Sequence, residues 1–216
     1  MLKNIFNRKE EEKRIQSEGR LPPGQSLTKK FPVLHYGPVP TFNVATWDFR
    51  VWGEVVEEVK WTWAEFQTLP RKKIEMDLHC VTRWSKFDTL WEGVSVKTLI
   101  DEGFIKLKPT AKHAVQHAEY GYTTNTPVET ILQDNFLLAT HFNGEPITPD
   151  HGYPLRGVIG AIPGRDDLKD VYLWKGAKWI RGIEFLSEDR MGFWERAGYH
   201  NVADVWKEER FARRSW

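Results

Sequence analysis

The stretch "DLHCVTRWS", residues 77–85, contains the only cysteine of this 216-residue chain. Apolar and polar residues alternate in the segment that leads into it, "KKIEMDLHC", and this period of two predicts a β-strand that ends at Cys80. The residues that follow the cysteine are mostly polar, as in a loop. Because loops on a rigid scaffold often carry functional groups, Cys80 is a candidate functional residue.

Further alternating or apolar runs predict strands, and short helical patterns lie between them. "FPVLHYGPVP", residues 31–40, is predicted to be extended because its prolines exclude a regular helix. No regular βαβ alternation is visible, so the sequence indicates an α+β domain around a largely mixed β-sheet. The predicted strands are "WDFRVWGEV" (47–55), "HAVQHAEY" (113–120) and "FLLATHF" (136–142). The predicted helices are "WTWAEFQTLP" (61–70), "VSVKTLIDEG" (94–103) and "TPVETILQDN", entered at Thr126 with Pro127 in its first turn.

Length and charge limit the classes of protein to which this chain can belong. A chain of 216 residues suits one domain, which we expect over residues 25–216. Residues 1–24 are rich in charge and end near a Pro/Gly hinge, so we expect a flexible lead-in. With 31 basic and 30 acidic side chains the net charge is +1. This balance gives no electrostatic reason to expect nucleic acid or an anionic membrane as a partner.

The amino-terminal residues show neither an apolar core of signal-peptide length nor a twin-arginine pair, and no apolar run approaches a membrane span. We therefore expect a cytoplasmic protein without membrane insertion. A single cysteine also excludes an intrachain disulfide and any zinc cage built from several cysteines.

The lone thiol has three interpretations. Free cysteine is often a buried, inert residue. His79 and Arg83 lie nearby in the sequence, however, and cationic neighbours favour the reactive thiolate. A thiolate would act as a nucleophile with one of the seven histidines as its base, although no hydrolase motif is present. Alternatively it would bind a soft metal whose remaining ligands come from a cofactor.

A second group of polar residues lies in "DHGYPLR" (150–156) and "WKGAKWIRGIEF" (174–185). His151, Arg156 and Lys178 are three hydrogen-bond donors, and Lys178 follows the small pair Gly176 and Ala177. Such donors suit a phosphate or a polar heterocycle, because arginine offers two parallel donors and lysine a point charge. The alternative is that they are solvated charges at strand ends.

Five motifs in order resemble the molybdopterin-binding domain of the sulfite oxidase family, in particular its bacterial members without haem. The resemblance extends over about residues 25–210 and implies an α+β fold with a mixed β-sheet. The motifs are "HYGPVP" (35–40), "CVTRWS" (80–85), "GYTTN" (121–125), "NGEPITPDHGYPLRGVI" (143–159) and "KGAKWIRGIEF" (175–185).

The resemblance implies a cofactor, molybdenum-molybdopterin, and a role for each motif. The metal is held by the dithiolene sulfurs of the pterin and by one protein cysteine, which corresponds to Cys80. The implied reaction is two-electron oxo transfer on a small-molecule substrate, such as sulfite, a sulfoxide or an N-oxide, with a separate electron-transfer partner. The residues implied to contact the pterin and its phosphate are His35, Tyr36, Thr123, Thr124, His151, Arg156, Gly176, Ala177 and Lys178.

The sequence also departs from the family pattern. Sulfite oxidases of animals and plants carry an immunoglobulin-like domain after the pterin domain, and those of animals carry a haem domain before it; we expect neither here. An arginine that helps to bind sulfite lies in the segment that matches "VLHYG" (33–37), where this chain has none. We expect Arg83, close to Cys80, to act in its place at the catalytic site. A cysteine-dependent hydrolase or transferase and a non-catalytic pterin-binding module remain as alternatives.

Overall fold

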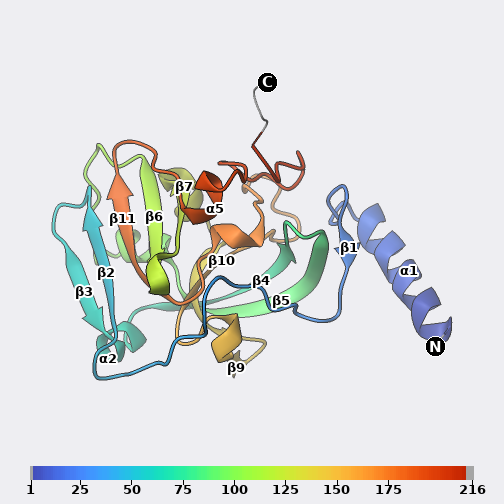
Figure 1. Ribbon diagram of the computed structural model, residues 1–216, viewed down its shortest axis with the longest axis horizontal. Helices are drawn as coiled ribbons and strands as arrows, with labels where there is room; N and C mark the ends of the chain where they lie inside the picture. Colours follow the sequence, from blue (N-terminus) through green and yellow to red (C-terminus); the bar gives the residue numbers. More distant parts are fainter. Residues whose placement is uncertain (1, 213–216) are drawn as a thin grey trace.

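The computed structural model describes residues 2–212 (Figure 1). Residue 1 of the predicted lead-in and residues 213–216 of the predicted domain lie outside this range. The elements in chain order are α1 (Leu2–Ser17), β1 (Ser26–Leu27), β2 (Asp48–Gly53), β3 (Val59–Thr62), α2 (Trp63–Gln67), β4 (Arg71–His79), β5 (Trp84–Val94), α3 (Val96–Asp101), β6 (His113–Ala118), β7 (Thr123–Pro127), α4 (Val128–Ile131), β8 (Phe136–Phe142), β9 (Glu145–Pro146), β10 (Arg156–Ile159), β11 (Ile180–Leu186) and α5 (Phe193–Arg196), with 3-10 turns at Glu119–Gly121, Pro149–His151 and Leu173–Lys175.

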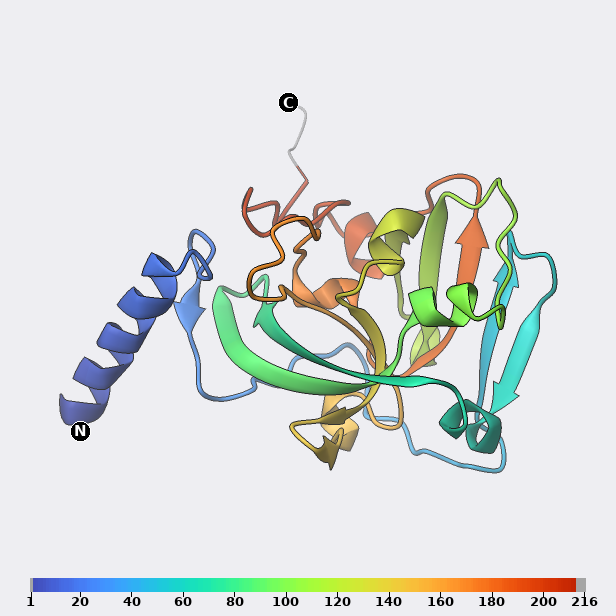
Figure 2. The ribbon, with the colours of Figure 1, turned by 180° about the vertical axis from the view of Figure 1, so that it is seen from behind.

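The strands form two mixed sheets. In the first sheet the order is β1-β5-β8-β10, with β4 also paired to β5 and β9 to β8; in the second it is β3-β2-β11-β6-β7. Each sheet has one parallel pair, β1 with β5 and β2 with β11. Figure 2 shows β4 and β5 as a long curved pair that extends from the α1 end of the molecule toward α2. The α+β class is confirmed, and the strands are divided between two sheets rather than one.

The strand β8 lies between two apolar clusters. Phe136 and Leu138 pack with residues of the second sheet such as Phe185, while Leu137 and Ala139 pack on the opposite face of the first sheet. A strand buried on both faces reads as a continuous apolar run, as "FLLA" does. Beside it, Gly93 of β5 is required by close approach, because a Cβ there would collide with the carbonyl of Leu138.

Seven of the observed strands were not predicted from the sequence, namely β1, β3, β5, β7, β9, β10 and β11. Polar residues at buried positions explain two of these misses, β5 and β7. In β5 the buried positions alternate regularly, but two of them are the polar residues Ser85 and Thr89. In β7 the buried residues are all polar, Thr124, Asn125 and Thr126. A hydrophobic alternation therefore could not reveal either strand.

The predicted short helices are present, but each is shorter than predicted, and Trp61 and Thr62 of the first one belong to β3 instead. The helix α2 begins after Thr62, whose side chain and that of Glu65 form a reciprocal capping box. The helix predicted from Thr126 was placed two residues too early: α4 begins at Val128, because Thr126 pairs with Ala114 in the ladder between β6 and β7.

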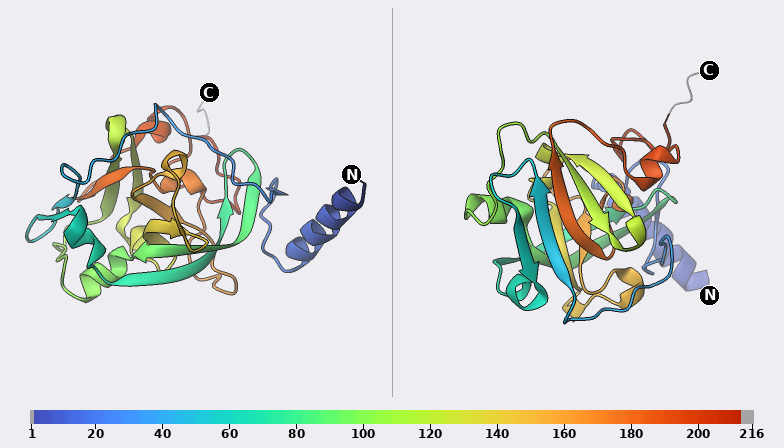
Figure 3. Two further views of the ribbon diagram at one scale, coloured as in Figure 1. Left: turned by 90° about the horizontal axis from the view of Figure 1, so that it is seen from below. Right: turned by 60° about the vertical axis from the view of Figure 1, so that its left-hand side comes forward.

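The amino-terminal helix α1 projects from one end of the molecule, on the side opposite β3 (Figure 3). Its last turns are attached to the first sheet: Ile15 is buried against Leu27 and Phe87. Just beyond the helix, Arg20 binds the buried Asp77 through two hydrogen bonds of 2.8 and 2.7 Å. The flexibility of residues 1–24 stays a prediction. Among residues 2–212 no helix is both long and apolar enough to cross a bilayer.

Candidate functional site

Cys80 lies at the end of β4, in the tight turn that leads to β5. The Cys80 N–H donates to the Trp84 carbonyl, and the Arg83 N–H donates to the Cys80 carbonyl, both at 2.9 Å. Arg83 has a φ of 71°, in the left-handed region that closes such a turn. The predicted position of the thiol, at a strand end entering a loop, is confirmed.

Arg83 itself is not brought to the site. Its side chain is exposed and is not part of the cavity wall in front of Cys80. Its backbone N–H closes the turn through the hydrogen bond to Cys80, and its carbonyl accepts a hydrogen bond from the Ser26 N–H at 3.1 Å. A role for Arg83 in catalysis stays a prediction, without support from a contact in the cavity.

A cavity of about 330 Å³ opens in front of the thiol. Its wall brings together segments that are far apart in the sequence: the extended residues 31–36, the Cys80 turn, and three later stretches around residues 151–156, 173–179 and 194–199. Seven of the predicted site residues lie in this wall, namely His35, Tyr36, Cys80, His151, Arg156, Gly176 and Lys178.

Arg156, on β10, is the most deeply buried cation of the wall, with only 1% of its surface exposed. It donates to the carbonyls of Gly157 at 3.2 Å and His151 at 3.0 Å, and its guanidinium lies over the Trp91 ring at 5.5 Å. Within residues 2–212 no carboxylate forms an ion pair with it. Burial lowers the pKa of Arg156 to about 10, so it is charged at neutral pH.

Lys178 is the second cation of the wall. Its Nζ donates to the Asp150 carbonyl at 2.8 Å, and no carboxylate of the described chain pairs with it. Burial, together with the nearby Arg156 charge, lowers the pKa of Lys178 to about 7. Buried charges are normally paired, so two cations at one wall without carboxylate partners in the described chain suit an anionic ligand.

His151 adds a neutral polar group to this wall. Its ring stacks on Phe31 with centroids 4.0 Å apart, and burial followed by the charges of Lys178 and Arg156 lowers its pKa to about 4. Its Nδ1 is buried and has no hydrogen-bond partner among the described residues, and the same is true of Trp84 Nε1. Unpaired buried polar atoms beside a cavity indicate that a ligand would complete their hydrogen bonds.

His35 and Tyr36 form the rim of the cavity and are exposed. The His35 ring stands edge-on to Trp179 at 5.0 Å, and its Nδ1 lies 2.9 Å from the Gly37 carbonyl oxygen. The Tyr36 ring packs against Phe193 at 4.4 Å. The segment is extended, as its prolines predicted, and it closes one side of the cavity with aromatic rings.

Gln116 of β6, which was not predicted as a site residue, holds the loop that carries Gly176. Its amide donates to the Lys175 carbonyl at 2.6 Å and accepts from the Ala177 N–H at 2.9 Å. The Ala177 carbonyl accepts from Gly157 N–H at 2.8 Å, so both backbone groups of Ala177 are used inside the protein. Ala177 is accordingly not part of the cavity wall, whereas Gly176 is. A buried glutamine in a predicted strand gives no signal of such a role.

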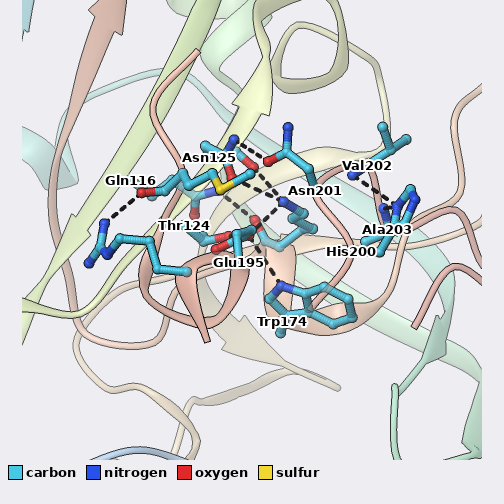
Figure 4. A network of polar contacts seen from close by, with 12 residues as sticks. Gln116, Thr124, Asn125, Trp174, Glu195, His200, Asn201, Val202 and Ala203 are labelled. Atoms are coloured by element: carbon cyan, nitrogen blue, oxygen red, sulfur yellow. Dashed lines mark hydrogen bonds and ion pairs between the residues drawn. The ribbon is translucent and has the colours of Figure 1, made fainter. Parts of the chain in front are cut away.

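Thr123 and Thr124 also lie outside the cavity wall. The Thr124 hydroxyl donates to Glu195 Oε1 at 3.0 Å, within a buried network that also includes Asn125 and Trp174 (Figure 4). At its centre Lys175 Nζ lies 2.6 Å from Glu195 Oε1. Trp174 lines the cavity and donates its Nε1–H to the same oxygen at 3.3 Å, so this network supports the wall from behind.

The thiol of Cys80 is 8% exposed and faces the cavity. Burial raises its pKa, while the Thr82 hydroxyl, 3.2 Å from Sγ, and the Lys178 charge act in the opposite direction. The expectation that His79 favours a thiolate is wrong. Its ring is buried away from the cavity, and burial lowers its pKa to about 3, so it carries no charge.

The wall fits a pterin cofactor with a phosphate and a soft metal. Cys80 offers a sulfur ligand, Arg156 and Lys178 offer two cations for an anion, and His151 and Trp84 offer unpaired polar atoms. The aromatic rings around them suit a flat heterocycle.

Comparison with known proteins gives the family. Residues 36–194 match the model of the oxidoreductase molybdopterin binding domain. The chain is 42% identical over 194 residues to the oxidoreductase YuiH of Bacillus subtilis, covering 89% of this chain and 92% of that protein.

More distant relatives are longer. Sulfite oxidase of Arabidopsis thaliana is 21% identical over 199 residues, covering 76% of this chain and 48% of that protein. The sulfane dehydrogenase SoxCD of Paracoccus pantotrophus has the same fold, with a TM-score of 0.63 at 17% identity over 85% of this chain and 48% of that chain. The chain thus spans about half the length of these two. The resemblance seen in the sequence is confirmed, and the chain belongs to the molybdopterin-binding oxidoreductases, enzymes of the family of sulfite oxidase and nitrate reductase that use molybdenum-molybdopterin.

Proposed function

We propose that the chain catalyses two-electron oxo transfer at a molybdenum-molybdopterin centre, with Cys80 as the protein ligand of the metal. The observation that carries the proposal is the position of the thiol. The sulfur of Cys80 opens on a cavity whose wall also holds the buried Arg156 and the half-buried Lys178, neither of which has a carboxylate partner in the described chain.

The bound cofactor supplies a metal that changes its oxidation state by two electrons and exchanges an oxygen atom with the substrate. The residues of the chain bind and orient it. Arg156 and Lys178 neutralise its anionic part, and the thiolate of Cys80 donates to the metal. Because the pKa of Lys178 is about 7, its Nζ can also hold or release a proton near neutral pH.

The substrate is proposed as a small molecule of the sulfite, sulfoxide or N-oxide type. Among the relatives, one is a sulfite oxidase and another a putative protein-methionine-sulfoxide reductase subunit, YedZ1 of Azospira oryzae, 24% identical over 82% of this chain and 64% of that protein. We further propose a separate electron-transfer partner, since a single cysteine cannot hold an iron–sulfur cluster. A cytoplasmic location stays a prediction that cell fractionation would test.

Replacement of Cys80 by serine tests the ligand assignment. We expect the wild-type protein, made in a host that synthesises molybdopterin, to contain nearly one molybdenum per chain. Cys80→Ser should lower turnover at least about 100-fold, more than the usual effect of replacing a residue that only orients a metal ligand, with unchanged circular dichroism. Retained turnover in the variant would refute the ligand role.

The same preparation of wild-type protein distinguishes the proposed function from its two alternatives. Metal-free protein whose activity is lost on alkylation of the thiol would indicate a cysteine-dependent hydrolase or transferase. Protein with bound cofactor but no turnover with any oxygen donor or acceptor would indicate a non-catalytic pterin-binding module.

A further inference from the structure

A chain of buried hydrogen bonds leads to the backbone of Cys80 from the side away from the cavity. His79 Nδ1 lies 2.7 Å from Ser85 Oγ. The Ser85 hydroxyl donates to Gln25 Oε1 at 3.2 Å, and the Gln25 amide donates to the Cys80 carbonyl at 3.2 Å. The three side chains belong to residues no more than 8% exposed, and none of them lines the cavity.

All donors in this hydrogen-bond chain point toward Cys80. The Ser85 hydroxyl has one hydrogen, which it gives to Gln25, so it must accept from His79, and the proton of the neutral imidazole lies on Nδ1. Hydrogen bonds aligned in series polarise one another in a low-dielectric interior. The Cys80 carbonyl therefore receives a stronger donor than an isolated amide would provide.

The far end of the hydrogen-bond chain lies against the carboxy-terminal segment. His79 Nε2 lies 3.4 Å from Asp170 Oδ2 with no hydrogen bond between the two atoms, and Asp170 Oδ2 accepts a hydrogen bond from Trp206 Nε1 at 3.1 Å. The near end is fixed by β1. Its pairing with β5 brings Gln25 to the turn, although Gln25 and Cys80 are 55 positions apart in the sequence.

These bonds leave the sulfur little freedom. The Cys80 N–H is bound to Trp84, and its carbonyl accepts from both Arg83 and Gln25. With its main chain held on both sides, the residue can move Sγ mainly by rotation about χ1. The Thr82 hydroxyl at 3.2 Å restricts this rotation as well.

We propose that Gln25, Ser85 and His79 are positioning residues, which hold the Cys80 main chain so that Sγ meets the metal in one geometry. The inference rests on the proposed function of Cys80. None of the three touches the cavity, so they act through the cysteine and not on the substrate.

The test compares Gln25→Met, which keeps the length of the side chain without its polar atoms, with Ser26→Ala as a matched control. Ser26 is the next residue, and its side chain is exposed. In protein loaded with cofactor, Gln25→Met should shift the visible absorption band of the thiolate–molybdenum bond. It should also lower kcat about 10-fold with KM changed by less than about 2-fold. Ser26→Ala should behave as the wild type.

A double-mutant cycle sharpens the test. Ser85→Ala should change the absorption band and kcat in the same direction as Gln25→Met but less strongly. The double variant should have a kcat no lower than that of Gln25→Met alone, because both changes break the same hydrogen-bond chain. Thermal unfolding of each variant checks the fold, and the alkylation rate of Cys80 in cofactor-free protein should rise about 3-fold or more as the turn loosens.

The outcomes separate this inference from the proposed function. An unshifted band, unchanged kcat and an unchanged alkylation rate in folded Gln25→Met would overturn the positioning role, as would additive effects in the cycle. If the absorption band persisted in Cys80→Ser, the ligand assignment would fail instead.

Discussion

Two lysines on the same stretch of chain, the buried Lys175 and the half-buried Lys178, differ in their partners. Lys175 is 1% exposed and binds Glu195 at 2.6 Å, with further hydrogen bonds to the main-chain and side-chain oxygens of Asn125. Three residues later Lys178 donates to one backbone carbonyl and Arg156 beside it donates to two, and within residues 2–212 neither has a carboxylate partner. A buried charge with a carboxylate partner is part of the scaffold, whereas unpaired cations at a cavity wall are available to an anionic ligand.

The ion pair between Lys175 and Glu195 supports the cavity wall that carries Lys178. Lys175 donates to Glu195. In the network of Figure 4 Glu195 also receives the indole N–H of Trp174, a cavity residue. The network ties α5 and β7 to the loop that carries Lys178. Loss of the pair and loss of the free cations should therefore have different consequences, the first for stability and the second for binding.

The largest effect is expected for Lys175→Met, which leaves Glu195 charged and buried without its partner. We expect the free energy of unfolding to fall by about 3–5 kcal/mol, as is typical of a broken buried ion pair. Urea unfolding of the cofactor-free protein measures it. The double variant Lys175→Met/Glu195→Leu should recover most of the loss; if it unfolds as easily as Lys175→Met, the pair is not the cause.

Arg156→Met should weaken cofactor binding without lowering stability, in contrast to Lys175→Met. Since Arg156 has no carboxylate partner in the described chain, the cofactor-free variant should be as stable as the wild type or more stable. Cofactor binding should weaken by about 2–5 kcal/mol, the usual effect of removing one member of a buried charged contact. Titration of cofactor-free protein with molybdopterin measures this. A stability loss as large as that of Lys175→Met would remove the distinction between the two regions.

The stability of the cofactor-free protein should rise with pH because of Lys178. Its pKa is about 7 in the folded protein and about 10.4 in an unfolded chain, so between these values the unfolded state holds the extra proton. The free energy of unfolding should gain at most about 1.4 kcal/mol per pH unit over this range. The groups whose charges act on Lys178 are all retained in the variant Lys178→Met, namely Arg156, Asp150 and Cys80. This variant should therefore lack the rise in stability with pH. An equal slope in both proteins would contradict the assignment.

The smallest effect is expected for Thr82→Val, which removes the hydroxyl beside Sγ while keeping the shape of the side chain. The pKa of Cys80 should rise further, because one of the contacts that lowers it is lost. The pH profile of alkylation in cofactor-free protein should shift to higher pH, with a change in unfolding free energy of about 1 kcal/mol or less. A profile that stays in place would show that Thr82 does not act on the thiol.

Much of the fold could be predicted from local pattern. The strand that ends at Cys80 and the cap of α2 depend on residues close in sequence, so alternation and turn chemistry reveal them. The strands β5 and β7 could not be found, because their buried residues include Ser85 and Asn125, whose polar atoms are satisfied by partners far away in the chain. A hydrophobic pattern carries no trace of such partners.

By itself the sequence determined which chemical groups the site has: one sulfur, a short set of cations and the aromatic segment 31–40, each recognisable from its motif. Only the tertiary structure decided which of them meet. It brings Arg156 and Lys178 to the cavity without counter-ions from the described part of the chain, and it directs the side chains of Arg83 and Thr124 elsewhere. The physical reason is that pairing and burial of a charge depend on residues that only the folded sheets bring within a few ångströms of one another.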